Sequence, residues 1–130
     1  MIYCLKSVSF AKYRLSLYNQ LERGDLPLKR YDKLVRDRIP EVIQAQGKKV
    51  VWRILTEEEH LVKLEEKLYE EVEEYQEDKS LEEMADVLEV LYSICSARGY
   101  TAAELEAERE KKAKNRGGFK DRIFLEYVDE

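Results

Sequence analysis

The chain has 130 residues, of which 44% are hydrophobic and 39% are charged, and its formal net charge is −5. That length fits a single domain with enough chain to bury a core. The acidic balance argues against a protein that binds nucleic-acid polymers, and no apolar run reaches the length that a membrane span needs. Two cysteines, Cys4 and Cys95, are too few for a disulfide framework. Free thiols are typical of reducing compartments, so we expect a cytoplasmic protein.

The first part of the chain differs in charge from the rest, because residues 1–30 hold six bases and only two acids. They lack the apolar segment and the small-residue cleavage site of a targeting peptide. We interpret them as a basic N-terminal extension of uncertain structure, in which the pattern favours a short strand and then a helix around Phe10–Leu21. After a break at Gly24–Pro27, the domain itself is expected to span residues 31–130.

The domain is expected to begin with one short helix and one short strand. Apolar residues between Leu34 and Ile43 indicate a helix that starts or is interrupted near Pro40 and ends before Gly47. The segment Val50–Leu55 is short and rich in β-branched residues, which favours a strand.

Two longer helices are expected next. Thr56, with Glu59 three residues later, forms the pattern of a capping box, and apolar residues then recur at helical spacing as far as Tyr75. Ser80 caps the following helix, again with an acid at the third position, and Gly99 ends it. Apolar side chains cover nearly every face of this second helix, which is typical of a helix buried on several sides.

The last part of the chain predicts one more helix and one more strand. Thr101 caps a helix that runs to about Asn115, with Glu104 completing a third capping-box pattern. A pair of glycines breaks this helix. The segment Phe119–Val128 is then expected to form a strand that pairs with Val50–Leu55.

Together these elements predict a mainly α fold, an antiparallel helical bundle with a small two-stranded β element. Two helices of an antiparallel pair cannot bury so apolar a helix as Leu81–Ala97 by themselves. We therefore expect the bundle to be completed by the last helix and by another subunit, as a homo-oligomer, either a dimer or a tetramer.

The strongest chemical signal is a pair of acids on each of the two long helices, Glu71 with Glu74 and Glu83 with Asp86. Residues three apart share a helix face, and the short connection makes the helices antiparallel neighbours. Glu74 is then expected level with Glu83, and Glu71 level with Asp86. Four converging carboxylates repel one another unless a cation holds them, and carboxylate oxygens suit Mg²⁺, with Mn²⁺ as a substitute. The pattern predicts a metal site for phosphate chemistry.

A solvated acidic surface is the alternative interpretation. Between Glu57 and Glu89 there are 15 acids against three bases, so paired acids also arise there by chance, and Glu83 has a second role as a capping acid. Other catalytic patterns are weaker. His60, the only histidine, is expected at the surface, which disfavours a Ser-His-Asp mechanism, and the chain has no P-loop motif.

The acid pairs, Glu71-x-x-Glu74 and Glu83-x-x-Asp86, resemble the signature of the all-α nucleoside triphosphate pyrophosphohydrolases, the MazG-like superfamily. Within it, the chain looks like the branch of predicted house-cleaning pyrophosphatases, which are similar to phosphoribosyl-ATP pyrophosphohydrolase. Three stretches in the right order carry that resemblance, which extends from about Tyr31 to Glu126: Tyr31–Pro40, Glu83–Val90 and Arg116–Phe119.

The resemblance implies hydrolysis of a nucleotide between its α and β phosphates, which yields a monophosphate and pyrophosphate. Glu71, Glu74, Glu83 and Asp86 would hold one or more Mg²⁺ ions, and Glu70 or Glu89 would accept the proton of the attacking water. Five basic residues are the candidates to bind phosphates: Lys33, Arg36, Arg38, Lys112 and Arg116. The last two share a helix face, and they equally fit cations that offset a helix dipole.

Two other hypotheses stay open at this point. The nearly all-apolar helix Leu81–Ala97 also suits a non-catalytic module for binding or oligomerisation. A third possibility within the same superfamily is the phosphoribosyl-ATP pyrophosphohydrolase of histidine biosynthesis.

Overall fold

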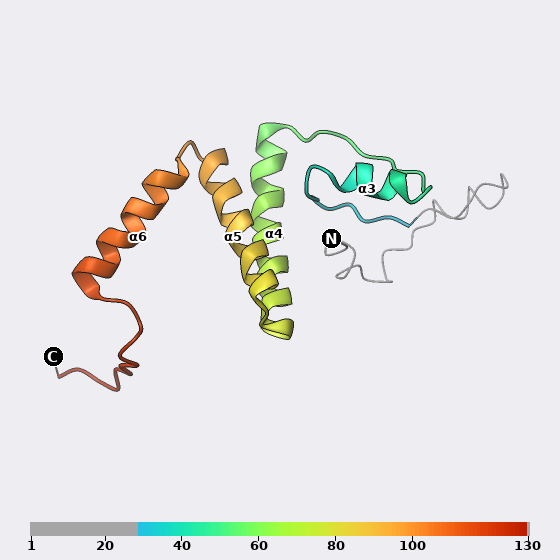
Figure 1. Ribbon diagram of the computed structural model, residues 1–130. Coiled ribbons are helices and arrows are strands. Elements are labelled where there is room, and N and C mark those ends of the chain that lie inside the picture. The colour runs from blue at the N-terminus through green and yellow to red at the C-terminus, as the bar shows by residue number, and fades with distance from the viewer. Residues whose placement is uncertain (1–28, 130) are drawn as a thin grey trace.

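The computed structural model describes residues 29–129, and it confirms a mainly helical fold. Figure 1 shows the helices of this range, and no strand occurs within it. None of these helices is both long and apolar enough to cross a bilayer. The helices are α3 (Ile39–Ala45), α4 (Glu57–Asp78), α5 (Leu81–Ala97) and α6 (Ala102–Arg116). The predicted N-terminal extension, with its strand and helix, lies outside the described residues apart from its last two positions.

The short helix α3 begins where proline allows it. Pro40 occupies the first turn, where its missing N–H breaks no helical hydrogen bond. The helix ends at Gln46, and Gly47 follows with a φ of 78°, a left-handed conformation that glycine adopts without strain. This matches the expected helix that starts near Pro40 and ends before Gly47.

Local side-chain chemistry sets the beginnings of the long helices. The Thr56 hydroxyl accepts the Glu59 backbone N–H at 3.2 Å, and the Glu59 carboxylate accepts the Thr56 N–H at 3.1 Å, so the predicted capping box is confirmed. The hydroxyls of Ser80 and Thr101 accept the N–H groups of Glu83 and Glu104 in the same way. Each N-cap lies where the sequence predicted it, but of these three caps only Thr56 forms a complete capping box, so the capping box predicted for Thr101 and Glu104 is present in its hydroxyl half alone.

Helices α4 and α5 form an antiparallel hairpin with an extensive shared contact (Figure 1). Only Lys79 and Ser80 separate them, and Lys79 takes a left-handed conformation with a φ of 55° to end α4. Leu64 of α4 and Val90 of α5 are the two apolar side chains buried deepest among residues 29–129. This hairpin is the part of the fold that positions the candidate site.

The expected bundle is not completed by residues 29–129 of a single chain. Helix α6 diverges from the hairpin and meets α5 only weakly, and none of its residues is buried (Figure 1). The expectation that the last helix closes the bundle was therefore wrong for the single chain. The physical reason is composition: Leu105 is its only large apolar residue, so α6 has little to bury.

One side of α5 is left exposed as a result. Met84, Leu88, Leu91 and Tyr92 each keep between 40% and 46% of their surface accessible, and Leu81 keeps 80%. We name these five residues the apolar face of α5. Among residues 29–129, α5 has a helical neighbour along most of its length only on the α4 side.

The predicted two-stranded β element is absent from the described part of the chain. Residues 50–55 and 119–128 are both irregular, and they lie far apart at opposite sides of the structure (Figure 1). Phe119 and Ile54 are 99% and 81% exposed. The β-branched pattern of each segment favoured a strand, but a strand needs a partner, and α6 carries the second segment away from the first.

Candidate metal centre

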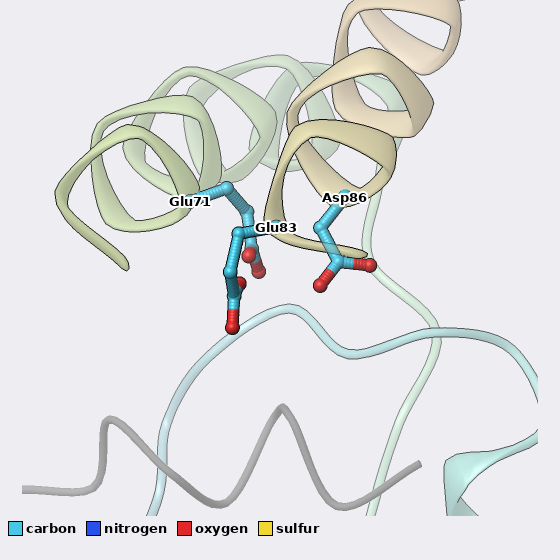
Figure 2. A group of neighbouring side chains, drawn as sticks. All are labelled: Glu71, Glu83 and Asp86. Carbon is cyan, nitrogen blue, oxygen red and sulfur yellow. The ribbon is translucent and has the colours of Figure 1, made fainter. Parts of the chain in front are cut away.

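Three carboxylates meet at the α4–α5 hairpin. Glu71 comes from α4, and Glu83 and Asp86 come from α5. One oxygen atom from each lies within 4.8 Å of the others, and the three residues are between 2% and 7% exposed. Figure 2 shows the three side chains directed to the same side of the hairpin, toward the segment that precedes α3. We name this group the acidic cluster.

The hairpin geometry explains why these residues meet. Glu83 and Asp86 are three apart and therefore share a face of α5. The two-residue connection fixes α5 against α4, which brings Glu71 opposite that face. Although Glu83 donates its backbone N–H to the Ser80 cap, its side chain turns into the interior. Only the hydroxyl half of a capping box is present at Ser80, whereas the Glu83 carboxylate, which was predicted as the capping acid, lies in the cluster.

Glu74 does not belong to the acidic cluster. Both of its carboxylate oxygens are shielded from solvent, but neither lies in the group of oxygens within 4.8 Å of one another. The sequence placed Glu74 level with Glu83, whereas the structure groups Glu83 with Glu71 and Asp86. Which acids meet depends on the register in which α4 packs against α5, and the spacing of acids along each helix does not determine that register.

The cluster fits a hard divalent cation. Glu71 Oε2 and Asp86 Oδ2 are buried, and neither accepts a hydrogen bond from residues 29–129. A buried carboxylate oxygen without a donor is costly, and two such oxygens beside a third acid also repel each other. Oxygen ligands from a few carboxylates are what Mg²⁺ prefers in proteins. The donor set and its unsatisfied oxygens therefore suit Mg²⁺ or Mn²⁺.

Two cations already contact the other oxygens of these acids. Arg36 Nη2 lies 2.6 Å from Asp86 Oδ1, and Lys67 Nζ lies 3.1 Å from Glu71 Oε1. Arg36 was among the predicted phosphate-binding residues, but Lys67 was not singled out from the sequence. The signal for Lys67 was present, because it precedes Glu71 by four residues and so shares its helix face.

The segment before α3 brings a second ion pair to the same face of α4. Lys33 Nζ lies 2.6 Å from Glu70 Oε1, and Lys67 Nζ lies 3.3 Å from the same atom. Glu70 is thus engaged by two ammonium groups. Glu89, the other predicted proton acceptor, is exposed on α5 and lines the pocket beside the cluster.

A pocket of about 360 Å³ adjoins the acidic cluster. Its wall includes Glu71 and Asp86, the cationic residues Arg36, Arg38 and Lys67, and His60. His60 was predicted at the surface, and the structure places it half-buried in this wall. Apolar residues complete the lining: Leu34, Val35, Leu64 and Val90. The pocket therefore combines carboxylates, cations and an apolar side, which suits a ligand that has both phosphates and an apolar ring.

The remaining predicted residues lie at or beyond the edge of this pocket. The Arg38 side chain is 88% exposed and its Nε lies 3.5 Å from Glu41. Lys112 and Arg116 are exposed on α6, which diverges from the hairpin, and neither lines the pocket (Figure 1). The structure thus brings Lys33, Arg36 and Arg38 to the site and leaves the two α6 residues outside it in a single chain.

Comparison with known proteins adds no relative. No protein family, curated protein or solved structure matches the chain. The interpretation of the site therefore rests on its geometry and on the sequence motifs.

Proposed function

We propose that this protein is a Mg²⁺-dependent nucleotide pyrophosphohydrolase that cleaves a nucleoside triphosphate between its α and β phosphates. The products are a nucleoside monophosphate and pyrophosphate, and the role that we propose for the reaction is house-cleaning of the nucleotide pool. The observation that carries the proposal is the buried acidic cluster, in which Glu71 Oε2 and Asp86 Oδ2 accept no hydrogen bond within residues 29–129.

The residues around the cluster have suitable roles for this reaction. Glu71, Glu83 and Asp86 would hold the metal, with Glu74 near them, and Mg²⁺ bound there would neutralise phosphate charge and orient the attacking water. Arg36 and Arg38 lie in the pocket wall, where guanidinium groups suit the phosphate oxygens. Glu89 also lines the pocket, without being a member of the cluster, and we assign it the proton of the water.

The sequence motifs support the same proposal. The stretch Tyr31–Pro40, which resembles the opening motif of the house-cleaning branch, contains both Lys33 and Arg36. The stretch Glu83–Val90, which resembles the metal helix, contains two acids of the cluster. Two stretches that lie about 50 residues apart in sequence therefore meet through the Arg36–Asp86 ion pair.

Phosphorus NMR tests the proposal. The purified protein is incubated with a panel of nucleoside triphosphates and phosphoribosyl-ATP, with Mg²⁺ or with a chelator. We expect a monophosphate and pyrophosphate to form only with Mg²⁺. Orthophosphate with a diphosphate means that a different bond is broken, and no turnover of any nucleotide contradicts the proposal. Preference for phosphoribosyl-ATP over all triphosphates assigns the enzyme to the histidine pathway instead.

Substitutions in the cluster sharpen this test. Loss of an outer partner of a metal ligand costs about 10–100-fold in activity or metal affinity, so loss of a ligand should cost at least about 100-fold. We expect Glu71→Gln and Asp86→Asn to lose activity to that extent, with an unchanged helical circular dichroism spectrum. Glu73→Gln and Glu82→Gln are the matched controls, because both acids are exposed on the same two helices. Full activity in both cluster variants contradicts the site.

A non-catalytic oligomerisation module is the second candidate function, and the exposed apolar face of α5 favours it. This module predicts self-association without any response to Mg²⁺. The two candidates differ in the thermal stability that Mg²⁺ confers, because a ligand that binds only the folded protein stabilises it.

A further inference from the structure

Lys67 is an unusual residue in the acidic cluster. Its side chain is 7% exposed, although lysine rarely lies buried without a partner. Its ammonium lies 3.1 Å from Glu71 Oε1 and 3.3 Å from Glu70 Oε1, and all three residues belong to α4. A rigid helix therefore holds this positive charge beside the cluster at a fixed spacing.

The contact with Lys67 gives the two oxygens of the Glu71 carboxylate different surroundings. Oε1 faces the ammonium, whereas Oε2 is buried and accepts no hydrogen bond from residues 29–129. The two oxygens of Asp86 differ in the same way, since Oδ1 meets Arg36 and Oδ2 has no such donor. Both residues are more than nine-tenths buried, and both belong to the group of converging oxygens. These two oxygens therefore carry buried negative charge that no hydrogen-bond donor among residues 29–129 offsets.

Arg36 and Lys67 differ in how readily each side chain can move away from its carboxylate partner. The Arg36 side chain is 49% exposed and comes from an irregular segment, so it can exchange Asp86 for water or for a phosphate. Lys67 is buried on the same helix as its partners, and its departure would leave a desolvated ammonium without a counter-charge. We therefore expect Lys67 to keep its position when a ligand enters the cluster. Arg36, in contrast, is able to move away from Asp86.

We propose that Lys67 serves as a permanent counter-ion that occupies the place of a second cation beside Glu71, so that the cluster takes one divalent ion. This inference rests on the proposed metal site and specifies its stoichiometry. The charges agree with it, because the three carboxylates of the cluster less the charge of Lys67 leave two negative charges. Lys67 is thus a positioning residue, which orients Glu71 so that Oε2 faces the ion.

Metal titration tests the stoichiometry directly. Mn²⁺ is added to the full chain without nucleotide, and bound Mn²⁺ is measured by electron paramagnetic resonance and by calorimetry. We expect one Mn²⁺ per wild-type chain. Two tightly bound ions per chain overturn the inference and leave the proposed function in place. If the wild-type chain binds no Mn²⁺, the metal site itself fails, and the proposed function fails with it.

Lys67→Met tests the counter-ion role, because methionine keeps the apolar stem and removes the charge. We expect its melting temperature in chelator to fall by about 5 °C or more and to recover with Mn²⁺. Mn²⁺ should also bind at least about fivefold more tightly, or as two ions, because a repelling charge has gone. Lys63→Met is the matched control, since Lys63 pairs with Glu66 one turn away, outside the cluster, and it should change none of these values.

Lys67→Arg keeps the charge and completes the test. It should retain one Mn²⁺ per chain and a melting temperature in chelator closer to the wild type than that of Lys67→Met. An equal loss of stability in Lys67→Met with and without Mn²⁺ overturns the inference, because Lys67 would then only fill space. Failure of Lys67→Met to fold even in Mn²⁺ overturns it as well.

Discussion

Arg36 and Asp86 connect the segment before α3 to α5 through one ion pair, with 2.6 Å between Nη2 and Oδ1. Asp86 is also a proposed metal ligand, and the guanidinium meets its Oδ1, whereas Oδ2, which accepts no hydrogen bond from residues 29–129, is the oxygen proposed for the ion. Arg36 also lines the pocket, where we expect its guanidinium to meet a phosphate of the nucleotide. We therefore expect this pair to link the proposed metal site to the proposed phosphate site.

Substitution of Arg36 should separate these two effects. We expect Arg36→Gln to raise the KM for the nucleotide by about tenfold, because a charge-assisted phosphate contact contributes about 1.5 kcal/mol or more. Stability without Mg²⁺ should fall by about 1–3 kcal/mol, between the values of surface and buried ion pairs. Steady-state kinetics and chemical denaturation measure both. Arg98→Gln is the control, because its pair with Glu65 lies outside the pocket.

Mg²⁺ should stabilise the folded chain. A ligand at 100 times its dissociation constant adds about 2.7 kcal/mol when it binds only the folded state. We expect Mg²⁺ to raise the melting temperature of the wild type and of Glu73→Gln, but not that of Glu71→Gln. Differential scanning calorimetry in Mg²⁺ and in chelator makes the comparison. The same melting temperature for the wild type in both buffers would favour the non-catalytic module.

The apolar face of α5 should bind a second copy of the chain. Met84, Leu88 and Leu91 follow helical spacing, and a two-fold axis lets the same surface serve both partners. We expect a homo-oligomer in solution, and Leu88→Glu should shift it toward the monomer. Light scattering coupled to gel filtration measures the mass. Val62→Glu is the control, because Val62 is exposed on the side of α4 turned away from Leu64. A monomeric wild type contradicts this prediction.

Lys112 and Arg116 should act only between subunits. They lie outside the pocket of their own chain, so a contact with phosphate requires the pocket of a second copy. We expect Lys112→Gln combined with Arg116→Gln to lower activity. Mixing that variant with Glu71→Gln should then restore about a quarter of wild-type activity, because half the dimers regain one complete site. No recovery on mixing, together with full activity of the α6 variant, removes both residues from the site.

The Arg53–Glu59 pair gives a pH prediction away from the site. The hydrogen bonds from Arg53 and from the Thr56 backbone lower the pKa of Glu59 from 4.5 to about 2. A lowered pKa in the folded state contributes stability above the unfolded value, and this contribution is lost as pH falls from about 4.5 through about 2. We expect Arg53→Gln to raise the pKa of Glu59 while leaving it below 4.5. Carboxyl carbon NMR follows this titration, and an unchanged pKa would contradict the assigned cause.

Features set by neighbouring residues were predictable from the sequence. The caps at Thr56, Ser80 and Thr101 depend on contacts three residues apart, and all three formed where the pattern indicated. The meeting of Glu71, Glu83 and Asp86 followed from helical spacing and a short connection. The caps are local relationships that need no tertiary contact, whereas the meeting of the three acids also needs α4 to pack against α5 in one register, and that register left Glu74 out of the cluster.

Features set by distant contacts were harder to predict. The strands expected at residues 50–55 and 119–128 did not form, because the described part of the chain places no strand partner beside either segment. Lys67 passed unnoticed because its burial depends on the packing of α4 against its surroundings, and a lysine on an acidic helix is ordinarily a surface residue. The contact of Arg36 with Asp86 spans 50 residues, and no spacing rule reaches that far.

The length of the two-residue connection between α4 and α5 determines which face of α5 meets Glu71, and so determines whether the acidic cluster forms. Each residue of an α-helix turns the chain by about 100°, so one residue inserted after Lys79 and absorbed into α5 would rotate Glu83 and Asp86 away from Glu71. An insertion after Gly117 would only lengthen an exposed segment. Natural variation in chain length is therefore expected after α6 and excluded at the hairpin turn, where one codon more or less would separate the three acids.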